Sequence, residues 1–242
     1  MPRFFIPAPI NTKEQHSYIL TGPDAAHIAG SLRMKPGEEI TLCAGDGLDH
    51  RCALVHIAPG EIEVKLLETL ATRSEPELKL HLFQCLPKGD KMEWVVQKAV
   101  ELGIGSITPV LSARCVSRPD AKTIIKKVDR WQKIAMEAAK QSGRGIIPIV
   151  NPMLHYTDLL QRQQDRLLIF YERGQDQIRE TVDPTAREIS LLIGSEGGFD
   201  QQEINAARKS GAKILSLGPR ILRTETAPLA AISILMYHCG EI

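Results

Sequence analysis

The hydrophobic periodicity of this 242-residue chain changes once, and this change constrains its fold more than any other feature. From Glu38 to Leu70, apolar and polar residues alternate in short runs separated by glycine and proline, which is typical of antiparallel hairpins. Beyond the polar stretch from Ala71 to Glu77, apolar runs of strand length alternate with helical patterns. The sequence therefore predicts a small β-rich barrel or sandwich over residues 1–72, followed by an α/β domain with a mostly parallel sheet over residues 73–242.

The same patterns predict the individual elements. In the first domain they predict one short helix over residues 24–34, capped by Asp24. In the second domain, Asp90 and Glu93 form a variant of the capping box at the start of a helix that ends at Gly103, and Thr226 is the expected cap of the last helix. The strands expected there span residues 78–86, 106–111, 167–171, 189–193 and 214–217, and the further helices span residues 121–142, 154–163, 201–209 and 229–237.

Composition excludes several classes of protein. The hydrophobic fraction of 43% is enough for a packed core, so a disordered chain is excluded. No apolar run approaches the roughly 20 residues that a bilayer span requires, and the first residues lack the pattern of a signal peptide, so we expect a cytoplasmic protein. The five cysteines form no C-x-x-C pair, which indicates reduced thiols and no metal site.

The net charge is only +1, but basic residues are concentrated between Ser112 and Arg144, where nine basic residues stand against three acidic ones. Four of them recur at helical spacing opposite an apolar face, which predicts one basic and one buried side of the helix at 121–142. An ordinary solvated face is the alternative, but the flanking arginines favour a surface for RNA phosphates. With one residue of the first domain, the candidate RNA contacts are Arg33, Arg114, Lys122, Lys126, Arg130, Lys133 and Arg144.

Two glycine-rich turns each follow a predicted strand, one from Ile193 to Phe199 and one from Leu217 to Ala227. In a parallel sheet such turns lie at the carboxyl ends of strands, where ligands bind, and glycine lets the backbone approach a nucleotide-like group. A side chain at Gly197 is accordingly expected to block that approach. The first turn is not a phosphate loop, because it lacks the Walker lysine and Glu196 would repel a phosphate. A tight turn with no ligand is the alternative.

Five ordered blocks of the sequence form a recognisable pattern: HIAGSLRM at 27–34, KGDKMEWVVQKAVELG at 88–103, EAAKQSGR at 137–144, IGSEGGF at 193–199 and LGPRILRTETA at 217–227. Together they resemble the bacterial small-subunit ribosomal RNA uracil-N3 methyltransferases, which belong to the SPOUT superfamily. The resemblance covers nearly the whole chain. One departure is Ser195, where the family often has proline.

The resemblance implies a PUA-like first domain that docks RNA and a second domain whose chain is tied in a trefoil knot. It also implies S-adenosyl-L-methionine as the methyl donor and a homodimer with its sites at the interface. The apolar helix at 229–237 fits such an interface, because it has almost no polar face. The implied partner is 16S ribosomal RNA or the small ribosomal subunit, with no DNA and no membrane.

The implied reaction is methylation of N3 of a uridine. N3 of neutral uracil carries a proton and is a poor nucleophile, so the site must assist deprotonation or stabilise the imide anion. Arg223 is the candidate for stabilising negative charge on a uracil oxygen, and Glu196 is a candidate proton acceptor that alternatively positions the loop. The predicted donor pocket comprises Gly194, Glu196, Gly197, Leu217, Gly218, Leu222 and Ala227.

Two other functions are compatible with the sequence. Another methyltransferase of the SPOUT superfamily would act on transfer RNA or on a ribose 2′-hydroxyl. A non-catalytic RNA-binding assembly factor of the ribosome would need the basic helix and the first domain but no methyl donor.

Overall fold

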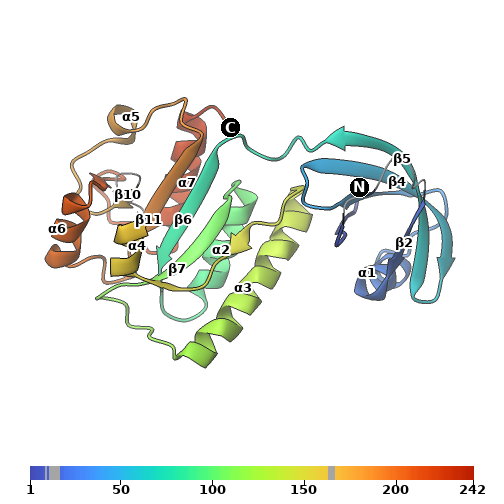
Figure 1. Cartoon of the computed structure of the whole chain (residues 1–242), viewed down its shortest axis with the longest axis horizontal. Helices are drawn as coiled ribbons and strands as arrows, with labels where there is room; N and C mark the ends of the chain where they lie inside the picture. Colours follow the sequence, from blue (N-terminus) through green and yellow to red (C-terminus); the bar gives the residue numbers. More distant parts are fainter. Residues whose placement is uncertain (9, 11–16, 163–166) are drawn as a thin grey trace. The chain divides into compact units, whose positions relative to one another are not determined.

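The computed structural model describes residues 1–8, 10, 17–162 and 167–242. The chain divides into two compact units, whose elements are shown in Figure 1. The first contains Met1–Glu75 and Ala139–Ile147, and the second contains Pro76–Ala138 and Pro148–Ile242. Residues 139–147, which were expected in the second domain, belong to the first unit.

The first unit is built on a five-stranded sheet in the order β1-β3-β4-β5-β2. The predicted antiparallel hairpins are confirmed by the pairing of β3 with β4 and of β4 with β5, and their inward side chains, such as Ile40, Leu54 and Ile62, form the core. The periodicity did not predict the first two strands. The strands are β1 (Arg3–Phe5), β2 (Ser17–Thr21), β3 (Glu39–Cys43), β4 (Leu48–Ala58) and β5 (Glu61–Ala71).

The helix expected at 24–34 differs from the prediction. The chain forms a short α-helix, α1 (Gly22–Ala26), followed by a π-helix, η1 (His27–Ser31). Proline within the first two helical positions favours this earlier start. Asp24 therefore lies inside the first turn and does not cap the helix, and its carboxylate accepts a hydrogen bond from Lys140 at 3.3 Å.

The second unit contains a parallel sheet in the order β12-β10-β11-β6-β7-β8, with β9 paired to β7. The central strands are buried along nearly their whole length, as expected of a parallel sheet covered on both faces. The two-residue strands β8 and β9 were not predicted. The strands are β6 (Lys79–Cys85), β7 (Ser106–Leu111), β8 (Ile149–Val150), β9 (Leu154–His155), β10 (Leu167–Phe170), β11 (Glu188–Ile193) and β12 (Lys213–Leu215).

The predicted helices form in the predicted order with local differences, and one short helix, α5 (Ile178–Thr181), was not predicted. The predicted helix at 154–163 begins two residues later, because Leu154 and His155 pair with β7, and Gln163 lies outside the described residues. No helix in the described part of the chain has the length and apolarity that a membrane crossing requires. The helices are α2 (Lys91–Glu101), α3 (Ala121–Ser142), α4 (Tyr156–Arg162), α5 (Ile178–Thr181), α6 (Gln201–Lys209) and α7 (Ala227–His238).

Helix capping differs from the prediction at two helices. Asp90 precedes α2 but makes no side-chain cap, because its backbone (φ −95°, ψ 8°) is not in the extended conformation of a capping residue. The Glu93 carboxylate pairs with Arg130 at 2.8 Å. Thr226 occupies the N-cap position of α7, also without a side-chain hydrogen bond. A complete capping box forms at α6, where Asp200 and Glu203 each accept the other's backbone N–H.

Candidate active site at the carboxyl ends of the strands

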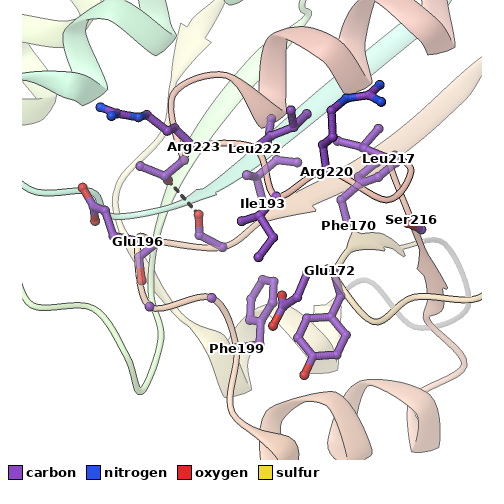
Figure 2. A pocket seen from close by; sticks show the side chains of 18 of the residues that line it. Phe170, Glu172, Ile193, Glu196, Phe199, Ser216, Leu217, Arg220, Leu222 and Arg223 are labelled. Carbon is purple, nitrogen blue, oxygen red and sulfur yellow. Dashed lines mark hydrogen bonds between the residues drawn. The ribbon is translucent and has the colours of Figure 1, made fainter.

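A cavity of about 520 Å³ lies at the carboxyl ends of β10, β11 and β12 (Figure 2). The two glycine-rich turns that follow β11 and β12 form most of its wall. Arg223 also lines the cavity, so the structure brings the predicted charge-stabilising residue beside the predicted donor pocket. Every residue predicted for that pocket is present in the wall, namely Gly194, Glu196, Gly197, Leu217, Gly218, Leu222 and Ala227.

The glycines of the first turn are required by close packing. A Cβ atom on Gly194 would lie 3.1 Å from the Cα of Gly198. A Cβ atom on Gly197 would lie 2.9 Å from the Cβ and 3.2 Å from the carbonyl oxygen of Arg114. The sequence predicted that the absence of a side chain at Gly197 makes room for a ligand. In the structure this absence makes room for the loop that carries Arg114, which corrects the prediction.

A buried hydrogen-bond network joins the two turns. The hydroxyl of Thr224, in the second turn, donates to the carbonyl oxygen of Gly194, in the first, at 2.8 Å. The side-chain amide of Gln84, at the end of β6, donates to the Thr224 hydroxyl at 3.2 Å. Gln84 is fully buried, so this network holds the second turn against the central strand of the sheet.

A second connection between the turns is ionic, and we call it the Lys91 clasp. The Nζ atom of Lys91 lies 3.1 Å from a carboxylate oxygen of Glu196 and 3.1 Å from one of Glu225. The backbone N–H of Lys88 donates to Glu196 at 3.1 Å. The clasp therefore ties the start of α2 to both turns.

The clasp also determines the charge state of its members. Burial opposes the charged form of Glu196, but hydrogen bonds from its own backbone, from Lys88 and from Lys91 outweigh it and lower the pKa of this carboxyl. At Glu225 burial is likewise outweighed by hydrogen bonds from its own backbone and from Lys91, so its pKa is lowered too, and hydrogen bonds to both carboxylates raise the pKa of Lys91. A carboxylate with a lowered pKa is a weaker base. These contacts favour the alternative that Glu196 positions the loop.

Arg223 is arranged differently from Glu196. Its side chain is exposed, and its positive charge contributes to lowering the pKa of Glu225. Figure 2 shows Arg223 and Glu196 on one side of the cavity and Arg220 on the other. A cation at this position can approach a substrate that enters the cavity from solvent.

Part of the wall was not predicted from the sequence. Phe170 ends β10, Tyr171 and Glu172 follow it, and all three line the cavity, because this strand ends at the same edge of the sheet as β11 and β12. Glu172 is exposed, and no ion pair joins it to another described residue. The signal that could have found it is a charged residue directly after a fully apolar strand.

The candidate RNA contacts fall into three groups. Lys122, Lys126 and Lys133 are exposed on α3, as is Arg130, which pairs with Glu93. Arg114 is exposed and donates a hydrogen bond to the carbonyl oxygen of Gly197 at 3.0 Å. In the first unit, Arg33 is exposed.

Arg144 does not belong to this exposed surface, which corrects the prediction. It is 4% exposed and pairs with the carboxylate of Glu75 at 2.7 Å. The same carboxylate accepts the backbone N–H groups of Gly145 and Ile146, so it anchors residues 144–146 within the first unit. Arg144 therefore has a structural position and is not available to a phosphate.

The comparisons with known families agree with this architecture. A family model described as an RNA methyltransferase domain matches residues 74–236, and one described as an RNA methyltransferase PUA domain matches residues 20–67. The fold and the cavity thus define the class as an RNA methyltransferase with an amino-terminal PUA domain. Within this class, the chain belongs to the ribosomal RNA small subunit methyltransferase E family, as the resemblance implied.

Individual relatives place the chain in this family along its whole length. It is 37% identical to ribosomal RNA small subunit methyltransferase E of Bacillus subtilis, over 98% of this chain and 97% of the relative. The crystal structure of the Neisseria gonorrhoeae enzyme of that name, bound to S-adenosyl methionine, is 33% identical with a TM-score of 0.87, covering 98% of this chain and 97% of that one. A Legionella pneumophila methyltransferase in complex with the same cofactor has a TM-score of 0.86 and 33% identity, covering 97% and 96%.

Proposed function

We propose that this protein transfers a methyl group from S-adenosyl-L-methionine to N3 of a uridine in 16S ribosomal RNA. The observation that carries the proposal is that both glycine-rich turns and Arg223 line the same cavity. The family supports it, since relatives that match nearly the whole chain bear the name of the small-subunit enzyme and two similar structures contain the cofactor.

The residues present fit this donor. Leu217, Leu222 and Ala227 offer an apolar wall for an adenine ring, and the backbone of the turns offers donors and acceptors for its edge. Glu172 presents a carboxylate to a ligand that carries a positive charge and ribose hydroxyls. When bound, S-adenosyl-L-methionine supplies an electrophilic methyl group.

The protein's own residues would prepare the acceptor. A uridine entering the cavity must be unpaired, because N3 lies on its pairing edge. Arg223 would donate a hydrogen bond to a uracil oxygen and so stabilise the negative charge that develops as the N3 proton leaves. Glu196, held by Lys88 and Lys91, would keep the first turn in place for this contact.

The same proposal covers the assembly of the protein. We propose a homodimer in which α7 contributes to the interface, supported by the exposed apolar side chains of Ile234 (43%) and Tyr237 (75%) on this helix. The trefoil knot implied by the resemblance is part of the proposal. After β12 the chain returns to β6, where the Thr224 hydroxyl accepts a hydrogen bond from Gln84, and this path is compatible with a knot. A ribosomal substrate would place the protein in the cytoplasm.

Small ribosomal subunits from cells that lack this gene provide the test. The purified protein and labelled donor are expected to produce 3-methyluridine in 16S ribosomal RNA, identified by mass spectrometry of nucleosides. A 2′-O-methylated product would favour the other SPOUT activity instead. Binding to subunits without measurable donor affinity in calorimetry would favour the assembly factor.

A further inference from the structure

A second cavity, of about 390 Å³, lies at the carboxyl ends of β7 and β9 and the starts of α4 and α6. All of its residues belong to the second unit, and apart from Arg118, one of the arginines that flank the basic helix, none of them was singled out from the sequence. We call it the β7 cavity. Its wall consists of Leu111, Ser112, Ala113, Arg118, His155, Tyr156, Thr157, Leu160, Asp200, Gln202, Glu203 and Ala206.

The β7 cavity adjoins the cavity of about 520 Å³ at the two glycine-rich turns, which we call the donor cavity. Phe199 lines the donor cavity and the next residue, Asp200, lines the β7 cavity. The partition between the two cavities consists of the first glycine-rich turn and the loop that carries Arg114, and two hydrogen bonds join them. The Arg114 guanidinium donates to the carbonyl oxygen of Gly197 at 3.0 Å, and the Ser195 hydroxyl donates to the carbonyl oxygen of Arg114 at 3.3 Å. The two cavities thus lie along the same edge of one parallel sheet, separated by one turn and one loop.

Hydrogen bonds fix the orientation of the polar side chains in the β7 cavity, but they occupy only some of the donor and acceptor atoms. The Nη2 atom of Arg118 donates to the carbonyl oxygens of Ala113 at 2.7 Å and Ser112 at 3.2 Å, which fixes the guanidinium. Its Nε and Nη1 atoms donate no hydrogen bond to any residue that the structure describes. Asp200 uses Oδ1 to cap α6, and both carboxylate oxygens of Glu203 accept backbone N–H groups.

The unused groups match the edge and face of a nucleobase. Arg118 offers N–H donors, the second oxygen of Asp200 offers an acceptor, and the exposed imidazole of His155 offers a flat surface for stacking. Two carboxylates against one arginine disfavour a phosphate inside the cavity, whereas base amino groups can donate to a carboxylate. The volume is within the range of sites for small organic groups.

We infer that the β7 cavity binds a nucleobase of the RNA that neighbours the target uridine, an inference that rests on the proposed function. Arg114, exposed on the partition, would meet the backbone phosphate between the two nucleotides. The uridine would enter the donor cavity while the neighbouring base enters the β7 cavity. The second base would then contribute to the choice of substrate.

The test measures binding of the protein to small ribosomal subunits with single base substitutions at each position near the methylated uridine. At one neighbouring position, the wild-type protein should lose about tenfold or more in affinity when the base is changed. The variants Arg118→Gln and His155→Ala should lose affinity for unaltered subunits by the same factor. On subunits with that base substituted, their affinity should not fall further. The matched control, Lys126→Gln, should weaken binding equally on all subunits, as a phosphate contact does.

Two controls make the outcome decisive. Donor affinity in calorimetry should stay unchanged in Arg118→Gln and His155→Ala, which shows that both variants fold. The inference would be overturned if these variants bound unaltered subunits with wild-type affinity. It would also be overturned if the wild-type protein lost affinity equally at every substituted position. Because binding does not require methyl transfer, absence of 3-methyluridine with the wild-type protein would reject the proposed function separately.

Discussion

Arg223 and Glu196 lie on the same side of the donor cavity but differ in their contacts. Glu196 is held by Lys88 and Lys91, and its lowered pKa makes it a weak base. Arg223 is exposed at the cavity. We therefore propose that the arginine acts on the substrate, whereas the glutamate supports the loop.

Arg223→Ala is expected to lower turnover by about 2–4 kcal/mol of transition-state stabilisation, because it removes the donor for the developing charge. Donor affinity should remain close to that of the wild type. Rates of methyl transfer to small subunits and calorimetry with the donor measure the two quantities. Arg220→Ala, on the opposite side of the cavity, is the control. Equal turnover in Arg223→Ala and the wild type would exclude this role.

Gly197→Val is expected to destabilise the protein by about 1–3 kcal/mol, because its side chain would displace the loop at Arg114. Donor affinity should fall as well, since this loop supports the turn. Urea unfolding and calorimetry check the two effects. Gly30→Ala is a control, because a Cβ atom there would meet nothing within 4 Å. Unchanged unfolding with lost donor affinity would restore the interpretation that the glycine admits the ligand.

The elements around the cavity are held by charge as well as by packing. The Lys91 clasp joins α2 to two turns that are distant in sequence, and α3 carries exposed lysines on one side. Both features depend on solution conditions, because ionic contacts respond to pH and salt.

The Lys91 clasp predicts a pH dependence of stability. The pKa values of Glu196 and Glu225 are lowered from an ordinary 4.5, so their contribution is present above about pH 4.5 and is lost as pH falls through the folded-state values. The pKa of Lys91 is raised from 10.5, so its contribution is lost only as pH rises beyond that value. Urea unfolding of Lys91→Met should therefore show a smaller acid-induced loss of stability than the wild type. Identical acid profiles would contradict a role for the clasp.

The basic side of α3 predicts a dependence on salt. Lys126→Gln with Lys133→Gln should weaken RNA binding and flatten the salt dependence by about one unit of slope per lost phosphate contact. Donor affinity should not change, because neither lysine lines the donor cavity. Arg130→Gln is expected to have a smaller effect, since this arginine already pairs with Glu93. An unaltered slope in the double variant would move the RNA surface to the first unit, around Arg33.

The whole molecule is proposed to act as a dimer, and α7 supplies the test. Tyr237→Glu places a charge on a side chain that is 75% exposed, so an isolated chain should tolerate it, whereas an apolar interface should not. Light scattering is expected to show a dimer for the wild type and a monomer for the variant, with methyl transfer reduced in parallel. A wild-type monomer at micromolar concentration would reject the proposed dimer.

Local sequence determined much of this protein. The hydrophobic period distinguished the β-rich unit from the α/β unit, because a residue's exposure in a strand or helix follows its spacing, and α3 (Ala121–Ser142) and α6 (Gln201–Lys209) lie within their predicted bounds. Glycine after an apolar strand also indicated both turns of the donor cavity, since the carboxyl ends of parallel strands meet at one edge.

Only the tertiary structure decided which distant residues meet. Gln84, Lys91 and Glu172 joined the site because β6, α2 and β10 are neighbours of the turns in space, which no periodicity records. Arg144 does not belong to the basic surface for the same reason, because Glu75, far away in sequence, is a half-buried partner for its guanidinium. Periodicity reports how exposed a residue is on its own element, whereas partners and cavities depend on how the elements pack.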